Sequence, residues 1–292
     1  MEDKKHYSIG EVSEICNVTR KALRFYDKIG MIVPDEIGEN NYRYYSRQTL
    51  LEVPVIKYYK QMGFRLEEMK QLINGSDYDQ LERSFRSKMD ELNELEKGLI
   101  IQRTSVKDWY NLILEARGVI NERVSEVSVK YVEPVNCCSM EYDFNYSYME
   151  AIINIDFTNF VEKIENAITG PVMILFPDFR QHMEGNAKKV RVIQKTLEPT
   201  CEDVTYTFIG GMYASCYHIG THRNIGKTYD KILKWVEENN YKCEDFSVER
   251  YVTDFWSTRY EENFVTEILI KISSAAVGGV CERRAAPWPE PY

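Results

Sequence analysis

Hydrophobic residues recur at helical spacing through the first 75 residues, and short polar breaks separate them. Ser8 is followed three positions later by Glu11, the spacing of a helix capping box, and an apolar run follows. Thr19 can cap a second helix over residues 20–28, which ends at Gly30. Two short helices joined by a tight turn predict a helix-turn-helix.

The next part of the pattern predicts a wing and two further helices. Residues 34–41 contain a proline and cannot be helical throughout, and they lead into the aromatic run 41–45. This run has the character of the wing in a winged helix-turn-helix. Helical periodicity returns over residues 47–62 and 66–73, and a glycine follows each helix closely.

A seven-residue hydrophobic repeat begins at position 78 and continues to position 113. Nine of its eleven core positions are apolar, and they are Tyr78, Leu81, Phe85, Leu92, Leu95, Leu99, Val106, Trp109 and Ile113, whereas Lys88 and Gln102 are polar. Such a stripe on a single helix must be buried against a partner, so we expect a homodimeric coiled coil through residues 78–113. The alternative is that the helix packs on the chain's own C-terminal domain.

From position 128 the pattern changes to short apolar strands with two helical segments between them. Strands are predicted within 128–142 and over 172–176, 190–196, 205–209, 212–219, 247–253 and 265–272, and helices over 152–168 and 225–238. The order strand, helix, two strands occurs twice, which predicts two copies of one α+β unit that share a core. The fold class is therefore α+β and multidomain.

The charge of the chain is distributed unevenly over these parts. The 292 residues carry a net charge of −9, yet residues 1–75 hold 12 Lys and Arg against 11 Asp and Glu. A local basic surface is enough for DNA binding, so the acidic remainder does not exclude it. We expect a DNA-binding domain at 1–75, a dimerisation helix at 76–120, an α+β domain at 121–274 and a disordered tail at 275–292.

Several classes of protein are disfavoured by the composition. The seven cysteines include no pair with the C-x-x-C spacing of zinc sites, so we expect neither a metal nor another cofactor. The polar start of the chain lacks the apolar segment of a signal peptide, and no apolar run has the length of a membrane span. A cytoplasmic protein without a membrane partner is expected.

Basic and aromatic residues alternate in the first domain in a specific pattern. The stretches 7–12, 22–30, 42–45, 63–64 and 66–69, together with Pro34, resemble the N-terminal domain of the MerR family of transcription regulators over residues 7–73. This resemblance implies that the helix beginning at Thr19 enters the major groove of double-stranded DNA. The implied DNA-binding residues are Thr19, Arg20, Lys21, Arg24, Tyr26, Tyr42, Arg43, Tyr44 and Lys60. Phe25 departs from the family, in which tyrosine is common at that position.

The same resemblance implies a mechanism of activation. Regulators of this family bind between the −35 and −10 elements of a promoter and distort the DNA so that RNA polymerase can use both elements. Phosphate contacts then compensate for the energy of DNA deformation. We therefore expect a ligand-dependent activator of transcription.

Residues 128–273 resemble the GyrI-like effector-binding domain, most clearly at 211–216, 229–233 and 264–270. In multidrug-sensing relatives, a buried glutamate and aromatic rings hold lipophilic cations, and that glutamate corresponds to Glu249. The remaining candidate ligand-binding residues are Tyr251, Phe264, Phe157, Val172 and Gly220, with Glu267 as a second acidic candidate. A delocalised cation can neutralise a buried carboxylate and stack on the rings. The alternative is that Arg250, or another basic side chain, already pairs with Glu249 at the surface.

Two other functions are consistent with this pattern. Some GyrI-like relatives are suspected hydrolases, and Glu249, Glu267, Tyr217 and His218 include groups capable of acid–base chemistry. The sequence contains no nucleophile elbow, metal-binding signature or nucleotide loop, so we assign no catalytic residues. The second alternative is an architectural DNA-binding protein that responds to no ligand.

Overall fold

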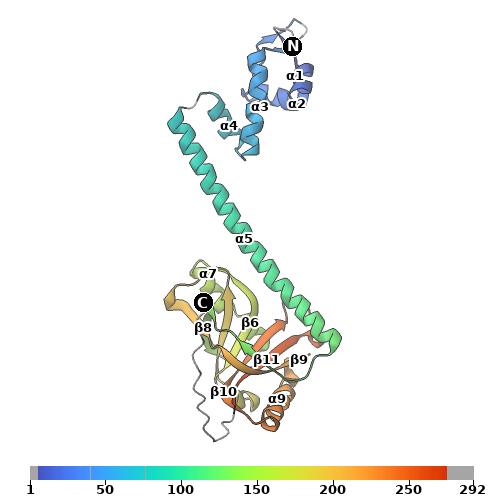
Figure 1. The fold of residues 1–292 in the computed structure, drawn as a ribbon, viewed down its shortest axis with the longest axis vertical. Helices are drawn as coiled ribbons and strands as arrows, with labels where there is room; N and C mark the ends of the chain where they lie inside the picture. The colour runs from blue at the N-terminus through green and yellow to red at the C-terminus, as the bar shows by residue number, and fades with distance from the viewer. Residues whose placement is uncertain (1–5, 40, 76, 275–292) are drawn as a thin grey trace, which may run out of the picture. The chain divides into compact units, whose positions relative to one another are not determined.

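The computed structural model describes residues 6–39, 41–75 and 77–274. The chain forms two compact units, Met1–Leu99 and Ile100–Tyr292, and the 45-residue helix α5 (Tyr78–Glu122) begins in the first and ends in the second (Figure 1). The predicted disordered tail at 275–292 lies outside the described residues.

The first unit is a small helical domain with a three-stranded sheet. Its elements are β1 (Tyr7–Ser8), α1 (Ile9–Ile15), α2 (Arg20–Lys28), β2 (Glu36–Ile37), β3 (Arg43–Tyr45), α3 (Arg47–Gln61) and α4 (Leu66–Ile73), followed by the start of α5. The sheet order is β1-β3-β2. Ser8 and Glu11 form the predicted capping box, and Thr19 accepts a hydrogen bond from the backbone of Ala22. The predicted winged helix-turn-helix is confirmed.

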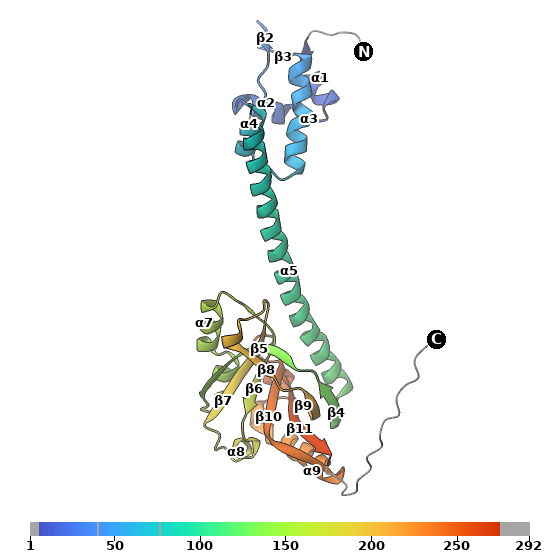
Figure 2. The same ribbon diagram turned by 60° about the vertical axis from the view of Figure 1, so that its left-hand side comes forward.

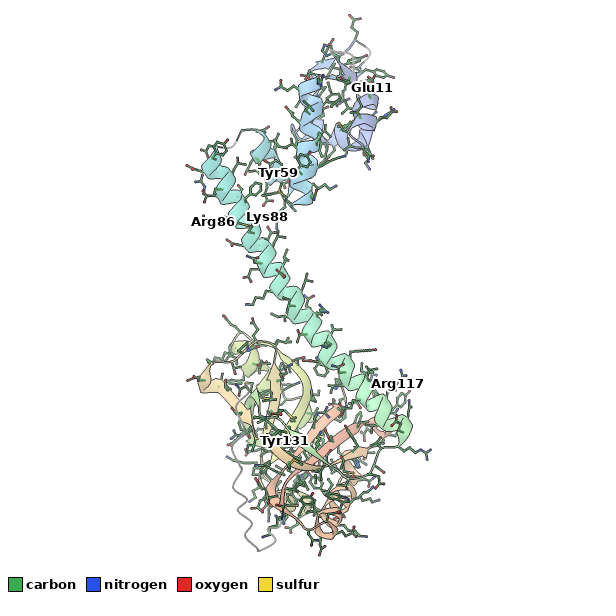
Figure 3. The ribbon with its side chains drawn as sticks, viewed as in Figure 1. Glu11, Tyr59, Arg86, Lys88, Arg117 and Tyr131 are labelled. Carbon is green, nitrogen blue, oxygen red and sulfur yellow. The ribbon has the colours of Figure 1, made fainter. Side chains whose placement is uncertain are left out.

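The start of α5 packs against the domain that precedes it. The ring of Phe85 lies 5.2 Å from that of Phe64 and 6.4 Å from that of Tyr59. Lys88 is buried, and its Nζ donates a hydrogen bond to Glu91 at 2.6 Å. Figure 3 shows Lys88 on the part of α5 that lies beside Tyr59. One side of Phe85 therefore packs on its own chain, whereas Tyr78 at the start of the stripe is exposed, and the buried Lys88 is held by ion pairs with Glu68 and Glu91.

The second unit is built on one eight-stranded antiparallel sheet. Its strands are β4 (Ser128–Val132), β5 (Val135–Asp143), β6 (Ile168–Phe176), β7 (Lys189–Thr196), β8 (Thr205–Phe208), β9 (Gly211–Ile219), β10 (Tyr241–Thr253) and β11 (Val265–Ser274). Its helices are α6 (Tyr148–Ile152), α7 (Ile155–Lys163), α8 (Phe179–Met183) and α9 (Gly226–Glu238), with short 3-10 turns η1 (Glu202–Val204), η2 (His222–Asn224) and η3 (Glu261–Asn263).

The strand order shows the internal repeat that the sequence predicts. The sheet runs β4-β9-β11-β10-β6-β7-β5-β8, so two blocks meet at the pairing of β6 with β10. The first block is β5, α6 with α7, β6 and β7, and the second is β9, α9, β10 and β11. β4 and β8 occupy the matching outer positions. The junction of the two blocks places Glu249 opposite Ile174 at the middle of the sheet.

Helices α6 to α9 and helix α5 pack on opposite faces of this sheet. Tyr229, Ile232 and Val236 of α9 pack on one face, together with Phe179 of α8. The last turns of α5 pack on the other face, where Leu112 and Ala116 meet Val252 and Val265. Figure 2 shows α5 running along the strands of the sheet. Because neighbouring side chains on a strand point to opposite faces, β10 contacts both layers.

Two segments of this unit differ from the sequence expectation. The predicted helix over 152–168 is shorter in the structure: α7 spans Ile155–Lys163, the chain turns at Glu165, which has a φ of 55°, and β6 begins at Ile168. Gly170 and Pro171 lie within β6, where the pairing register shifts between Thr169 and Met173. A bulge accommodates a proline that has no N–H to donate. The short helix α8, capped by Asp178, was not predicted.

Within the ranges that the structure describes, no helix is both long and apolar enough to cross a membrane.

Candidate functional site

A fully buried carboxylate lies at the centre of the second unit. Glu249 is 0% exposed and points to the face of the sheet that α6 to α9 cover. Its strand neighbour Arg250 points to the opposite face and pairs with Glu115 of α5 and with Glu267. The alternative of a surface pair with Arg250 is therefore wrong, although another basic side chain, His182, lies 2.9 Å from Glu249 in this buried site.

Three side chains from three elements bind the Glu249 carboxylate. Nε2 of His182 lies 2.9 Å from Oε1, and the hydroxyl of Tyr229 donates to the same oxygen at 3.0 Å. The hydroxyl of Tyr251 donates to Oε2 at 2.6 Å. An ionised carboxylate in a dry site is stable only with such partners, so this arrangement compensates for much of the cost of burying the charge.

These partners also determine the ionisation of the carboxylate. Burial by itself raises the pKa of Glu249, but the hydrogen bond and charge of His182 and the hydrogen bond from Tyr251 outweigh it, so the pKa lies below its ordinary value. Burial and the negative charge of Glu249 raise the pKa of Tyr229 and of Tyr251 well above the ordinary range. The site therefore holds one negative charge among neutral hydroxyls.

Aromatic rings surround this charge on several sides. The ring of His182 stacks on Phe176 with centroids 3.7 Å apart, and Tyr148 stacks on His222 at 4.6 Å. Burial lowers the pKa of His222 to about 4, and the charge of Glu249 opposes that shift only in part. His222 is therefore a neutral ring at physiological pH. Stacked rings beside a carboxylate are the environment that binds lipophilic cations.

A cavity of about 570 Å³ opens beside this cluster. Its walls include Tyr148 and Met149 of α6, His222, Phe255 and the rim carboxylate Glu261. His182 and Tyr229 also line it, and both bind Glu249 from the cavity side. Glu249 itself is not part of the wall. This volume falls in the range of small-molecule pockets.

The structure brings most of the predicted ligand-binding residues to this face. Tyr251 binds the carboxylate directly, and Phe157 and Val172 belong to the same hydrophobic cluster as Tyr251. The ring of Phe264 lies 5.6 Å from that of His222. Gly220 has a φ of 114°, and it is not part of the cavity wall.

Glu267 is separated from this group because it lies on the opposite face. It is 1% exposed and accepts hydrogen bonds from Ser215 at 2.5 Å and from Arg250 at 2.8 Å, and Lys130 is a further partner. It therefore cannot act as a second ligand carboxylate beside Glu249. Instead it forms part of the charged network that joins the sheet to α5.

The sequence analysis missed both histidines of the site. His182 lies on the unpredicted helix α8, and His222 lies on a 3-10 turn between two strands. Neither position belongs to the stretches that carry the family resemblance. A useful signal was present in the composition, because the chain has only four histidines and two of them lie in this domain after predicted strands.

A second candidate surface lies on the first unit. Arg20, Lys21, Arg24 and Lys28 of α2 are exposed, whereas Leu23 on the same helix is fully buried. Tyr26 is half-buried and packs against the core of this unit, and Lys60 of α3 is exposed. One face of α2 thus holds the helix in place while the other presents cations, as in helices that bind a DNA groove.

The wing is fixed to this helix by an ion pair. Nε of Arg43 donates to Asp27 of α2 at 2.7 Å, which raises the pKa of Arg43 further. Tyr44 pairs with Ser8 across the small sheet, and Tyr42 is exposed at the start of β3. Arg43 is therefore a structural link as well as a candidate phosphate contact, and the structure places the predicted wing residues next to α2.

Comparisons with known proteins match both units. Residues 7–76 match the family described as MerR HTH family regulatory protein, and residues 126–273 match the GyrI-like small molecule binding domain. The second match covers half of the chain. No group of three or more metal-binding side chains occurs among residues 6–39, 41–75 and 77–274.

Two curated relatives align over nearly their whole length. The Multidrug-efflux transporter 2 regulator of Bacillus subtilis (strain 168) is 27% identical over 277 residues, which are 92% of this chain and 97% of the relative. The Multidrug-efflux transporter 1 regulator of the same organism is 25% identical over 293 residues, covering 92% and 99%. A solved structure titled "Cryo-EM structure of EcmrR-DNA complex in EcmrR-RPo" is 20% identical, with a TM-score of 0.46, and the match covers 92% of this chain and 100% of that one.

Proposed function

Because this chain belongs to the MerR family of regulatory proteins and carries a GyrI-like small molecule binding domain, we propose that it activates transcription when a lipophilic cation binds beside Glu249. The observation that carries the proposal is the buried, ionised carboxylate next to a ring-lined cavity. Its two relatives are named as regulators of multidrug-efflux transporters, which supports a sensor for varied compounds rather than for one metabolite.

The class of ligand follows from the electrostatics of the cavity. The pKa of Glu249 is lowered, so the carboxylate carries a full negative charge, while the surrounding tyrosines are neutral. A cation gains Coulomb energy from this charge and can stack on Tyr148 and His222. An apolar cation loses little hydration on entry, so it is favoured over a small ammonium ion.

Exposed hydrophobic residues on α5 support the homodimer that the repeat predicts. Leu92, Leu95, Leu99, Val106 and Ile113 occupy core positions of the heptad and remain exposed, with Leu99 at 65%. Two positions within the stripe contact rings of the same chain: Phe85 packs on Phe64, and Trp109 packs on Trp256. A second α5 is the partner that matches this stripe in length and spacing.

Paired subunits place two α2 helices on one duplex. In the proposed mechanism Arg20 and Lys21 lie near base edges in the major groove, and Arg24 contacts phosphate. Contacts from both subunits stabilise a bent and untwisted spacer between the −35 and −10 elements, which RNA polymerase then recognises. Ligand binding shifts the dimer towards the conformation that holds this distorted DNA.

An Arg24→Ala substitution is expected to weaken DNA binding without changing sequence preference. Each lost phosphate contact reduces the magnitude of the slope of log K against log salt concentration by about 1. Because the dimer loses one contact in each subunit, the magnitude of its slope should fall by about 2. Fluorescence anisotropy of labelled promoter fragments at several salt concentrations measures both quantities. Arg86→Ala is the matched control, because Arg86 is exposed on α5 and pairs with Glu82 (Figure 3). An unchanged slope for Arg24→Ala contradicts the assigned surface.

We also infer that the protein releases its ligand unchanged and is not an enzyme. Of the groups weighed for hydrolysis, Tyr217 and Glu267 lie on the α5 face, away from Glu249. His218 is held by Thr228 at 2.9 Å and by the backbone of Thr221. A bound ester or amide should therefore be recovered intact after long incubation, and any protein-dependent hydrolysis contradicts this inference.

A further inference from the structure

One turn of the second unit contacts both the ligand cavity and helix α5. This β10–β11 turn, residues 254–264, joins the end of β10 to the start of β11. Its residues Phe255 and Glu261 line the cavity wall. Trp256 follows Phe255 directly and packs on Trp109 of α5, with ring centroids 4.6 Å apart. The cavity wall and the contact with α5 are therefore carried by neighbouring residues of one short segment.

The two neighbouring rings belong to different hydrophobic clusters. Phe255 packs against the cluster that contains Tyr251, a ligand of Glu249, and its ring lies 4.8 Å from that of Phe264. Trp256 packs against the cluster in which the last turns of α5 meet the sheet. The β10–β11 turn thus crosses from the layer that holds the cavity to the layer that holds α5.

The packed position of this turn buries two polar atoms at a cost. Oδ2 of Asp254 and Nε1 of Trp256 are buried and have no hydrogen-bond partner among residues 6–39, 41–75 and 77–274. Asp254 is 0% exposed, and burial raises the pKa of its carboxyl to about 6, which shows that the turn accommodates this charge poorly. Opening of the turn would return both polar atoms to water, where they are hydrogen-bonded.

Ring contacts oppose this cost and hold the turn in place. The backbone amides of Ser257 and Thr258 donate to the backbone oxygen of Asp254 at 3.0 Å and 3.3 Å, and these bonds close the turn on itself. The rings of Phe255 and Trp256 attach it to the rest of the domain. An element that is held by a few side chains against the cost of buried polar atoms opens more easily than the strands beside it.

We propose that the contact between Trp256 and Trp109 couples the ligand cavity to α5: a cation that packs on Phe255 holds the β10–β11 turn in its packed position, and Trp256 then fixes α5 on the sheet. This inference rests on the proposed function and adds the route by which a bound ligand acts on α5. The ligand contacts Phe255 only when the turn is packed, so it binds that state more tightly than the open one.

The coupling is reciprocal, because a ligand and a contact that favour the same state stabilise each other. Neither Trp109 nor Trp256 lines the cavity, so both are positioning residues that act through the turn. α5 is continuous from Tyr78 to Glu122, and it carries the proposed dimer seam. A change in how firmly it is held on the sheet therefore reaches the seam directly.

Hydrogen–deuterium exchange of the full-length protein, followed by mass spectrometry, tests this coupling. Tetraphenylphosphonium is the cationic probe, because its charge does not vary with pH. Exchange is compared with and without the cation in peptides from the β10–β11 turn and in peptides from α5 around Trp109. In the wild type the cation should slow exchange in both segments by about fivefold or more, because it stabilises the packed turn and, through Trp256, the packed α5.

A Trp109→Leu variant removes the ring contact and keeps the helix, since leucine favours helices and suits a d position of the heptad. Its affinity for tetraphenylphosphonium should stay within about tenfold of the wild-type value. The cation should still slow exchange in the turn but not in α5, and the ligand-dependent rise in transcript from a bound promoter fragment should be lost. Trp235→Leu is the matched control, because Trp235 lies on α9 and stacks on Tyr241, and it should keep both responses.

A second variant tests whether the two rings act as one contact. Trp256→Leu on the Trp109→Leu background should lower affinity for tetraphenylphosphonium no further, because a single contact is lost only once. Two independent losses that multiply would show that the tryptophans stabilise the domain separately, and this result contradicts the coupling.

The outcomes distinguish this inference from the function on which it rests. Wild-type binding of tetraphenylphosphonium without slower exchange in α5 overturns the coupling and leaves the cation sensor intact. A full transcript response by Trp109→Leu also overturns it. If Trp109→Leu does not fold, as judged by circular dichroism, exchange in the wild type decides. No binding of the cation by the wild type overturns both the inference and the proposed ligand class.

Discussion

A Glu249→Gln variant is expected to lose its affinity for lipophilic cations while its affinity for DNA is unchanged. The substitution conserves shape: one of the Tyr229 and Tyr251 hydroxyls can still donate to the amide oxygen, and the other can accept from the amide NH2, so the domain should fold. The negative charge is lost, however, and a buried charge pair that loses one partner costs about 3–5 kcal/mol. Affinity for tetraphenylphosphonium should therefore fall on the order of 100-fold or more. Fluorescence competition with a cationic dye measures the loss.

The control for this variant is a carboxylate at the mouth of the same cavity. Glu261 lines the cavity but is exposed to solvent, so its interaction with a ligand is screened. Glu261→Gln should change affinity by less than about threefold. Promoter binding by both variants should equal that of the wild type, because Glu249 and Glu261 lie outside Met1–Leu99. Equal dye affinity in Glu249→Gln and wild type would falsify the assigned site.

An Arg250→Met variant should show the largest loss of stability in the second unit. The guanidinium makes two hydrogen bonds to Glu115, at 2.7 Å and 2.6 Å, and one to Glu267 at 2.8 Å. Removing the guanidinium leaves the buried Glu267 and the partly buried Glu115 with fewer hydrogen-bond partners. The free energy of unfolding should therefore fall by about 3 kcal/mol. For a unit of this size the midpoint of thermal unfolding should fall by roughly 6–12 °C.

Tryptophan fluorescence reports on this unit alone, because the first 99 residues contain no tryptophan and Trp109 packs on Trp256. Arg180→Met is the matched control: its ion pair with Asp245 is well exposed, so the loss should stay below about 1 kcal/mol. Equal midpoints for the two variants contradict the structural role of the Arg250 network.

The pH dependence of stability provides a second readout of the same network. Burial raises the pKa of Glu115, but the hydrogen bonds from Arg250 and Tyr217 outweigh it and bring the pKa below its ordinary value of 4.5. As the pH falls, Glu115 therefore takes up a proton in the unfolded chain before it does so in the folded protein. The stabilisation that ionised Glu115 gives the folded protein is complete above pH 4.5 and is lost as the pH falls below it. In Arg250→Met this loss should be smaller. A steeper acid transition than that of the wild type argues against this assignment.

Sequence patterns predicted the elements whose periodicity is local. The capping box at Ser8, the cap at Thr19 and the helix that carries the heptad repeat depend on residues within a few turns of one another, and the structure contains both caps and a continuous helix α5 over the repeat. The duplicated order of strands and helices also led to the correct fold class, because two similar patterns of length and polarity follow each other along the chain.

The parts that escaped prediction depend on contacts between distant positions. His182 lies 67 residues from Glu249 in sequence, and α8 is only five residues long, so no periodic signal marks either its helix or its role. Glu267 was assigned to the wrong face because the alternation of β11 relative to β10 depends on the register between them. Read from the sequence alone, Gly170 and Pro171 indicate the end of a helix. In the structure they lie in a bulge inside strand β6.

Transcription in vitro is the most direct test of a cation-responsive regulator. The template is a promoter fragment that the purified protein retains in a salt-dependent manner, and bacterial RNA polymerase is added with and without tetraphenylphosphonium. Wild-type protein should raise the amount of transcript when the cation is present, and Glu249→Gln should occupy the same fragment without that increase. A transcript level that does not respond to bound cation, or an equal response by Glu249→Gln, contradicts the account.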